Sequence, residues 1–425
     1  MTNKNRFETF GCRLNFYETE VMRKISERTG LTNSVIVNTC AVTSEAVKKA
    51  KKSLRKLRRE EPKKKIIVTG CASQIDPTNF TRTKTADVIL GNGKKLSERV
   101  WRNIAATKKR SRNDVVDNYV DDIMSVKDNS LSRDNIITSF AKRSRAYVQI
   151  QNGCNHRCTF CIIPYGRGNS RSLELSSVIE QIKILVNNGF KEVVLTGVDL
   201  TDWGKDLSTK LRLGKLVKEI LKCVPDLSRL RLSSIDSIEV DTDLLEVISY
   251  EKRFMPHLHL SIQSGDNLIL KRMKRRHSRE NIIEFCERLE MVRPEITFGA
   301  DFIAGFPTET KEMFSNTLAL VKECNITWLH IFPYSIRQGT PAALMPQVDK
   351  ETIRSRAQIL RQASDNQIKA YLNLNIGKTH NILVENHFLG RTETFAEVIF
   401  KKQKDIGSII SATIADHNGK QLITN

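Results

Sequence analysis

The amino-acid sequence predicts an α/β protein in three parts: an N-terminal parallel βα domain, a central partial barrel of six βα units and a small C-terminal all-β module. Short apolar runs alternate with helical periodicity up to about residue 105 and again from residue 145, whereas the last 50 residues alternate apolar with polar side chains. Strands alternating with helices favour a parallel sheet, and strict apolar–polar alternation is typical of half-exposed strands. A chain of 425 residues also exceeds what one hydrophobic core usually serves.

The N-terminal domain is expected over residues 1–108. Its predicted strands lie at Arg6–Phe10, Ser34–Asn38, Lys65–Thr69 and Asp87–Leu90, and its predicted helices at Asn15–Arg28, Ser44–Glu61 and near Lys94–Ala105. This order predicts a parallel sheet with helices on its faces. Residues 109–140 are polar and charged without a sustained period, so we interpret them as a linker.

The partial barrel is expected over residues 141–374. Its six predicted strands are Ala146–Ile150, Glu192–Thr196, Arg229–Ser233, His257–Ile262, Thr297–Ala304 and Trp328–Pro333. A long polar helix over Lys350–Leu374 follows them. In such barrels the active site lies at the carboxyl ends of the strands, so functional residues are expected there.

The C-terminal module is expected over residues 375–425. Three segments alternate apolar and polar residues, and Asn418-Gly419 is a turn signal. The segments are His380–Glu385, Thr394–Phe400 and Ser408–Ala415.

The composition indicates a globular protein with a polyanionic partner. Apolar residues make up 40% of the chain and charged residues 28%, no apolar run is long enough to span a membrane, and the N-terminus lacks a signal peptide's apolar core. We therefore expect a cytoplasmic protein without membrane contact. The net charge of +21 favours RNA or DNA as a partner over general basic enrichment.

Three cysteines in the segment QNGCNHRCTFCIIP predict an iron–sulfur cluster. Cys154, Cys158 and Cys161 follow a predicted strand directly. Three thiolates can hold a cubane and leave the fourth iron free for a chelating cofactor, which the amino and carboxylate groups of S-adenosylmethionine suit. The alternative is a zinc site, which usually needs four protein ligands; His156 lies inside the loop, where its geometry as the fourth is poor.

Three further cysteines occupy equivalent places in the N-terminal domain. Cys12, Cys40 and Cys71 each follow a predicted strand and precede a helix. Because such positions lie along one edge of a parallel sheet, they should converge and hold a second cluster. The alternative is three buried structural thiols. Without an export signal disulfides are not expected, and the other thiols have apolar neighbours in helical segments and are expected in the core: Cys223, Cys286 and Cys324.

With these motifs in place, the chain resembles the radical S-adenosylmethionine methylthiotransferase family over its whole length. FGCRLN, NTCAVT and TGCASQ are similar to that family's N-terminal cysteine motifs, and CNHRCTFCIIPYGRG is similar to its radical motif. RLSSIDSIEVD, HLHLSIQSGD and GADFIAGFPTET are similar to its barrel-strand motifs, and the tail lies where the family carries a TRAM domain. CRLN and NTCAVT resemble the MtaB type, which implies 2-methylthiolation of N6-threonylcarbamoyladenosine at position 37, in the anticodon loop of tRNA.

The resemblance implies two 4Fe–4S clusters and S-adenosylmethionine as cofactors, and a reducing donor such as a flavodoxin or ferredoxin. It also implies that two S-adenosylmethionine molecules are consumed, one as methyl donor and one as radical source. It implies that the loop cysteines hold the radical-generating cluster and that the N-terminal ones hold an auxiliary cluster for sulfur. Rival substrates are N6-isopentenyladenosine in tRNA and a ribosomal-protein aspartate. A rival from another class is a non-catalytic RNA-binding or electron-carrying iron–sulfur protein.

Cofactor contacts are expected at the ends of barrel strands, at Thr196, Gly197, Ser261, Gln263 and Gly305. Arg167 and Arg171 are expected to meet a phosphate or the cofactor carboxylate. His257 and His259 alternate on one strand and are interpreted as a hydrogen-bonded pair rather than metal ligands.

Two basic segments are expected to contact RNA phosphates. Residues 48–65 contain eleven Lys or Arg against two Glu, and the alternative there is a solvated helix. The second segment follows the fourth barrel strand at the predicted rim of the active site. Its residues are Lys271, Arg272, Lys274, Arg275 and Arg276.

Overall fold

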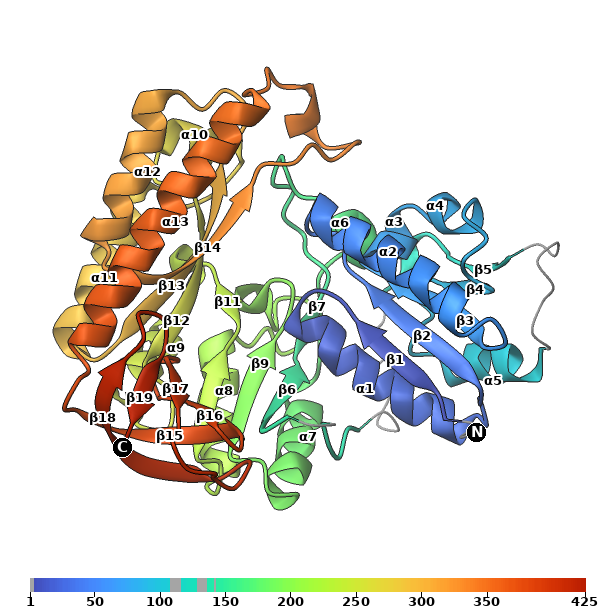
Figure 1. Ribbon diagram of the computed structural model, residues 1–425, viewed down its shortest axis with the longest axis horizontal. Coiled ribbons are helices and arrows are strands. Elements are labelled where there is room, and N and C mark those ends of the chain that lie inside the picture. Colours follow the sequence, from blue (N-terminus) through green and yellow to red (C-terminus); the bar gives the residue numbers. More distant parts are fainter. Residues whose placement is uncertain (1–3, 108–115, 128–135, 141–142) are drawn as a thin grey trace.

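A five-stranded parallel sheet forms the N-terminal part of the chain. The computed structural model describes residues 4–107, 116–127, 136–140 and 143–425. The strand order is β1-β2-β3-β4-β5, and every residue of β2, β3 and β4 is buried. Figure 1 shows this domain as the blue part of the ribbon. Its elements are β1 (Arg6–Thr9), α1 (Arg13–Arg28), β2 (Ser34–Thr39), α2 (Ser44–Glu60), β3 (Lys65–Gly70), α3 (Cys71–Ile75), α4 (Thr78–Thr81), β4 (Val88–Leu90), α5 (Glu98–Ala106), β5 (Asp117–Tyr119) and the 3-10 helix η1 (Ile123–Ser125).

The last strand of this sheet comes from the segment predicted as a linker. β5 pairs in parallel with β4 from Asp117 to Tyr119, and η1 lies against α6 (Ile163–Arg167) of the central part. The interpretation of this stretch as pure linker is therefore wrong where it is described, because β5 offers only three residues and no period that a sequence pattern can reveal. Residues 108–115, 128–135 and 141–142 lie outside the described part of the chain, and the domain boundaries stay predictions.

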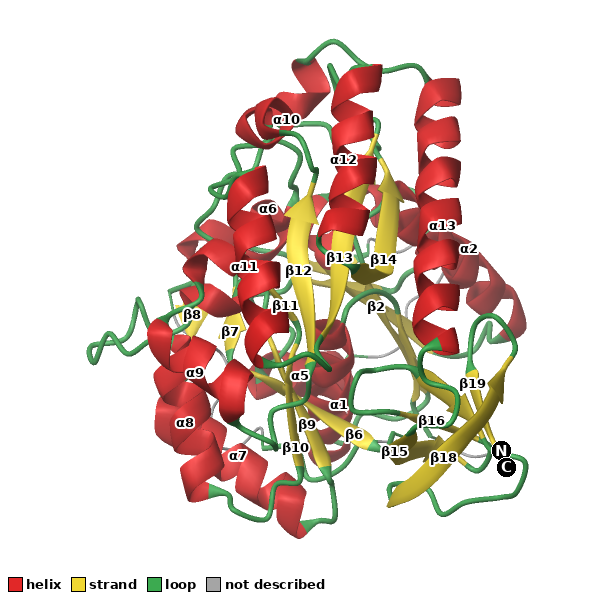
Figure 2. Cartoon of the chain, turned by 90° about the vertical axis from the view of Figure 1, so that its left-hand side faces the viewer, coloured by secondary structure: helices red, strands yellow, loops and turns green. Residues whose placement is uncertain are grey.

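The central part is the open barrel of six βα units that the sequence predicts. Its strands form two parallel sheets in the orders β10-β9-β6 and β11-β12-β13-β14. Helices α11, α12 and α13 cover the outside of the second sheet (Figure 2). The elements are β6 (Arg145–Gln149), β7 (Gln151–Asn152), α6 (Ile163–Arg167), β8 (Arg171–Ser172), α7 (Leu175–Asn187), β9 (Glu192–Thr196), η3 (Leu200–Asp202), α8 (Leu213–Cys223), β10 (Arg229–Leu232), β11 (Ser234–Ile235), η4 (Ser237–Glu239), α9 (Thr242–Tyr250), β12 (His257–Gln263), α10 (Asn267–Arg272), α11 (Arg279–Val292), β13 (Thr297–Ala304), α12 (Lys311–Glu323), β14 (Ile326–Pro333), η5 (Pro341–Leu344) and α13 (Lys350–Asn373).

The C-terminal module is a small closed β-barrel. Its strands run in the order β15-β16-β17-β19-β18 around a core that includes Ile382, Val398 and Phe400. The same core contacts Trp328 of β14 and Tyr371 of α13, so the module is packed against the central barrel. Its strands are β15 (Thr379–Asn386), β16 (Leu389–Arg391), β17 (Glu397–Ile399), β18 (Ile409–His417) and β19 (Leu422–Thr424).

Phe395 of the C-terminal module contacts the end of the central barrel opposite the carboxyl ends of its strands. Its ring stacks on His257 at 4.8 Å between centroids, and the guanidinium groups of Arg145 and Arg231 each lie 5.2 Å from it. These arginines share the fully buried carboxylate of Glu192. The barrel is thus closed at this end by an aromatic ring and an ion-pair cluster.

The predicted pair of His257 and His259 is wrong in one respect. Both are buried on β12, but His259 shares a hydrogen bond of 2.9 Å with Asp301 of β13, while His257 stacks on Phe395. These partners lie far away in sequence, so strand periodicity alone could not assign them. Every helix in the described part of the chain is too short or too polar to span a lipid bilayer.

Candidate active site between the N-terminal domain and the barrel

A cavity of about 350 Å³ lies where the N-terminal domain meets the carboxyl ends of the barrel strands. Residues from both parts of the chain line it, and they include all six cysteines of the two predicted groups: Cys12, Cys40, Cys71, Cys154, Cys158 and Cys161. The parallel topology explains the convergence, since strand ends that are distant in sequence share one edge. The remaining cysteines behave as predicted: Cys286 and Cys324 are buried in the core, and Cys223 packs against it.

The N-terminal cysteines lie at strand-to-helix junctions. Cys12 is the N-cap of α1, Cys40 follows β2 directly, and Cys71 is the first residue of α3. Gly11 has a φ of 100°, and a Cβ there would lie 2.7 Å from the sulfur of Cys40. Only glycine therefore allows these strand ends to approach so closely.

Burial raises the proton affinity of two of the thiols, one from each group. Burial raises the pKa of Cys40 to about 12, and the neighbouring Cys71 adds to this effect. Burial likewise raises the pKa of Cys161 to about 11. Thiols in such surroundings keep their protons unless a cation takes their place, as iron does in a thiolate-bound cluster. Three thiols in each group are a donor set that suits such a cluster.

The loop of Cys154, Cys158 and Cys161 runs from β7 to α6. It is held at both ends: the backbone amide of Cys154 donates to the Gly168 carbonyl, and that of Thr159 to the Met273 carbonyl. Gly153 has a φ of 75°, and a Cβ there would lie 1.8 Å from the Asn169 carbonyl oxygen. Backbone contacts thus hold the loop against α6 and the end of α10.

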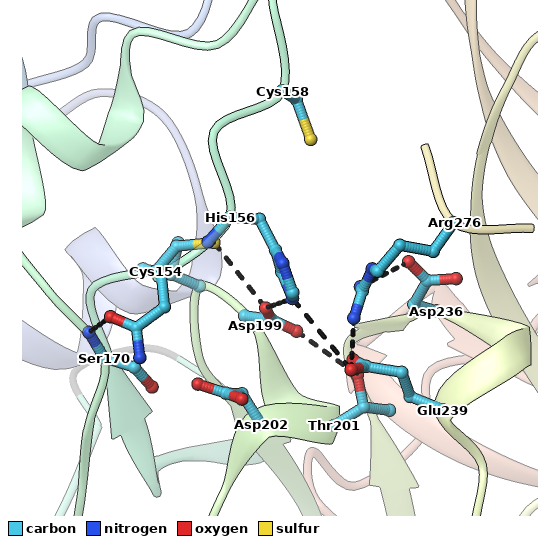
Figure 3. Close-up of polar contacts among 12 residues, drawn as sticks. Cys154, His156, Cys158, Ser170, Asp199, Thr201, Asp202, Asp236, Glu239 and Arg276 are labelled. Carbon is cyan, nitrogen blue, oxygen red and sulfur yellow. Dashed lines mark hydrogen bonds and ion pairs between the residues drawn. The ribbon is translucent and has the colours of Figure 1, made fainter. Parts of the chain in front are cut away.

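A carboxylate and a histidine lie beside the first loop cysteine, and the sequence did not single the carboxylate out. Asp199 follows β9; one of its oxygens lies 3.6 Å from the Cys154 sulfur and 3.0 Å from Nε2 of His156 (Figure 3). Although burial opposes ionisation, the hydrogen bond with His156 lowers the pKa of Asp199. Asp199 lies just after a barrel strand, in the segment TGVDL, and this position could have identified it as a candidate site residue.

A second buried carboxylate, Asp236, follows β11 at the other side of the cavity. It accepts hydrogen bonds from Arg275 at 2.8 Å and Arg276 at 2.9 Å, and Arg276 also pairs with Glu239 (Figure 3). These contacts bring a carboxylate-bound pair of arginines to the wall that faces Cys158.

The chain matches known proteins over nearly its full length. The profile of the radical SAM superfamily matches residues 148–321, and that of uncharacterized protein family UPF0004 matches residues 4–91. A Rickettsia prowazekii protein named threonylcarbamoyladenosine tRNA methylthiotransferase MtaB is 49% identical over 97% of this chain and 96% of its own. The Bacillus subtilis protein of the same name is 34% identical over 96% of this chain and 93% of its own. The chain belongs to the radical SAM methylthiotransferase family, MtaB type.

The comparison with solved structures supports the fold. The radical SAM methyltransferase TsrM from Kitasatospora setae, solved with cobalamin and a 4Fe–4S cluster, has a TM-score of 0.56 and 14% identity. The match covers 81% of this chain and 74% of that one. As a radical SAM methylthiotransferase this protein is an enzyme that uses S-adenosylmethionine and 4Fe–4S chemistry, as the sequence predicted. The electron-carrier alternative is thereby set aside.

The structure brings three of the five predicted cofactor residues to the cavity of this methylthiotransferase. Gly197, Ser261 and Gln263 line it, and Gln263 also lines an adjoining cavity of about 180 Å³. Thr196 and Gly305 are absent from the described linings of both. The amide of Gly305 donates to Glu309, and a Cβ there would lie 2.5 Å from the Ile353 side chain, so close packing against α13 explains this glycine.

The five predicted RNA-contacting residues do not share one environment. Lys271, Lys274 and Arg276 are exposed, whereas the side chain of Arg275 is only 9% exposed and lines the cavity. Nη2 of Arg275 also donates to the Ser261 carbonyl, and its Nη1 lies 3.9 Å from the Cys158 sulfur. Arg272 donates to Thr308.

Arg167 and Arg171, which are expected to meet a phosphate or the cofactor carboxylate, are both hydrogen-bonded within the protein, and Arg167 also lines the cavity. Their contact with either group stays a prediction. The guanidinium of Arg171 donates to the carbonyls of Arg167, Asn169 and Val126, and Arg171 is buried. Arg167 is also buried and contacts Glu18, Asn15 and Cys71 of the N-terminal domain. The partners of Arg167 lie about 100 to 150 residues earlier in the chain, so local sequence could not indicate them.

Proposed function

We propose that this enzyme converts N6-threonylcarbamoyladenosine at position 37 of tRNA to its 2-methylthio derivative. In this proposal Cys154, Cys158 and Cys161 hold a 4Fe–4S cluster that binds S-adenosylmethionine, and Cys12, Cys40 and Cys71 hold an auxiliary 4Fe–4S cluster. The observation that carries it is that both groups of three thiols line one cavity. The substrate follows the names of the relatives that match at 49% and 34% identity.

When bound, the radical-generating cluster would supply the electron that breaks the carbon–sulfur bond of one S-adenosylmethionine, and the auxiliary cluster would carry or activate the sulfur that is joined to C2 of the base. A second S-adenosylmethionine would supply the methyl group. The chain's own groups supply binding and orientation. The Asp199 carboxylate beside Cys154 can accept hydrogen bonds from the cofactor's amino group, and the Arg275 guanidinium near Cys158 can donate to its carboxylate. Ser261 and Gln263 of β12 line the same cavity.

The tRNA contacts are proposed for two exposed basic surfaces. On α2, Lys48, Lys52 and Arg55 are exposed, while Ala50, Leu54 and Leu57 hold the opposite face against the core. The second surface is the exposed part of the segment after β12, with Lys271 and Lys274. A net charge of +21 supports a polyanionic substrate over the ribosomal-protein alternative. The electron donor is proposed to be a reduced flavodoxin or ferredoxin, and the setting cytoplasmic.

The test is a nucleoside profile of tRNA from cells with and without the gene. We expect 2-methylthio-N6-threonylcarbamoyladenosine to disappear and its unmethylthiolated precursor to accumulate in the deletion strain. Restoration by the wild-type gene, but not by one encoding Cys158→Ala, is the control. Loss of the methylthio group from isopentenyladenosine instead would reassign the substrate within the family.

A further inference from the structure

One buried side chain connects the two groups of cysteines. Arg167 ends α6, six residues after Cys161, and is only 1% exposed. Its Nε lies 3.1 Å from the sulfur of Cys71, and its terminal nitrogens donate to Glu18 and Asn15. A residue of the loop-and-barrel part of the chain therefore hydrogen-bonds directly to a cysteine of the N-terminal group.

The charges around Cys71 are not balanced. Glu18 is fully buried and pairs with both Arg167 and Lys95, which is itself 1% exposed. Lys95 forms an ion pair with Glu18, although burial lowers the pKa of Lys95 to about 8. Two buried cations thus face one carboxylate. The surplus positive charge lies beside the thiols, where it favours any negatively charged group that those thiols bind.

The backbone around Arg167 is held tightly against the same cysteine. A Cβ at Gly166 would lie 3.4 Å from Cβ of Cys71 and 3.2 Å from Ile75, so α6 and α3 are in close contact. Nδ2 of Asn92 donates to the Gly166 carbonyl at 2.5 Å and lies 3.7 Å from the Cys71 sulfur. Arg167 is consequently fixed, and its hydrogen bond to Cys71 does not depend on a mobile surface chain.

We propose that Arg167 is a positioning residue that makes the auxiliary cluster easier to reduce, through its hydrogen bond and charge at the Cys71 ligand. The inference rests on the proposed function, since it needs a cluster on Cys12, Cys40 and Cys71. A donor at a cluster sulfur stabilises the reduced, more negative state and so raises the reduction potential. Glu18 acts in the opposite direction, because it places a negative charge next to the same donor.

The experiment isolates the auxiliary cluster and measures its potential. Cys154, Cys158 and Cys161 are replaced by Ala in the full chain, and the cluster signal is followed by electron paramagnetic resonance during a redox titration. Relative to this parent, Arg167→Gln should have a more negative midpoint potential and Glu18→Gln a more positive one. Arg167→Lys should fall between parent and Arg167→Gln, because it keeps the charge without the guanidinium fork. Arg157→Gln, at an exposed arginine within the loop of Cys154 to Cys161, is the matched control and should leave the potential unchanged.

The outcomes separate the two proposals. If the parent binds no iron although circular dichroism shows it folded, the proposed auxiliary cluster fails before Arg167 is tested. If the parent holds about four irons and Arg167→Gln keeps the parent potential, the inference on Arg167 is overturned. If Arg167→Gln loses its iron, the test passes to Arg167→Lys. A midpoint potential in Arg167→Lys equal to that of the parent would also overturn the inference. If Arg167 had only a structural role, Arg167→Gln and Glu18→Gln would change the stability of the protein but would not shift the midpoint potential in opposite directions.

Discussion

Asp199 illustrates how one residue at a strand end acquires a chemical role from its surroundings. It faces the cavity beside Cys154 and is kept ionised by His156. Asp199→Asn should keep its iron but raise the KM for S-adenosylmethionine about 10-fold or more, because a charge-assisted hydrogen bond contributes about 1.5–3 kcal/mol. The measurement is 5′-deoxyadenosine formation against cofactor concentration. Asp226→Asn, an exposed aspartate before β10, is the control, and an unchanged KM in Asp199→Asn would remove this carboxylate from cofactor binding.

Glu192 has a structural role at the opposite end of the barrel. Although burial opposes ionisation, three arginines lower its pKa from the ordinary 4.5 to about 2. A depressed pKa means that this carboxylate contributes stability above pH 4.5 and loses it as the pH falls from there towards 2. Glu192→Gln should therefore lower the free energy of unfolding at pH 7 by about 3–5 kcal/mol, since it leaves buried arginines without their partner.

Urea unfolding followed by circular dichroism measures this effect. The exposed Glu180 on α7 gives the matched control, Glu180→Gln, which should unfold as the wild type does. The difference in the free energy of unfolding between wild type and Glu192→Gln should become smaller as the pH falls below 4.5. A difference that stays constant with pH would show that Glu192 is not charged in the folded protein.

At the scale of single elements, α2 joins a buried face to a basic one. Neutralising Lys48, Lys52 and Arg55 to Gln should weaken tRNA binding and reduce the slope of log affinity against log salt by about three, one for each lost phosphate contact. Filter binding at several salt concentrations measures the slope. A matched control neutralises three exposed cations on the barrel helices α8 and α11: Lys215, Lys222 and Arg288. Equal slopes for the two triple variants would place the RNA elsewhere.

The elements with a sustained period were predictable from sequence. Ser44–Glu61 was expected as a helix and is one to Glu60, because Ala50, Leu54 and Leu57 repeat at helical spacing on its buried face. The six barrel strands were equally evident from apolar runs between helices. The convergence of Cys12, Cys40 and Cys71 followed from topology, since parallel strands end at one edge.

Two kinds of feature could not be predicted from the sequence. They are contacts between side chains far apart in the chain, and elements too short to show a periodic pattern. β5 has three residues and forms only because β4 offers an open edge. Phe395 lies in a turn with a φ of 74°, and nothing local indicates that its ring reaches His257. Arg275 belongs to a run of basic residues whose pattern predicts an RNA-binding surface. Its hydrogen bonds to Asp236 and the Ser261 carbonyl instead hold its side chain at the cavity.

At the scale of the whole molecule, the two cysteine groups are carried by different parts of the chain and meet in one cavity. The proposed function gives them separate tasks. Cofactor cleavage needs Cys154, Cys158, Cys161 and the barrel residues around them, whereas methylthio transfer also needs a sulfur carrier that faces the base. Arg167 connects the two parts through its hydrogen bond to Cys71, but it belongs to neither group of cysteines.

Two triple variants therefore test this division of labour. Replacing Cys12, Cys40 and Cys71 by Ala should leave reductive cleavage to 5′-deoxyadenosine within about twofold of wild type, well under the tenfold that 1.4 kcal/mol would cause, and abolish methylthiolation of tRNA. Replacing Cys154, Cys158 and Cys161 should abolish both. Both products are quantified in parallel, with circular dichroism to confirm folding. Methylthiolation by the first variant would make the N-terminal thiols structural. A folded first variant that cannot cleave the cofactor would instead show that the two domains are coupled more tightly than this division of labour allows.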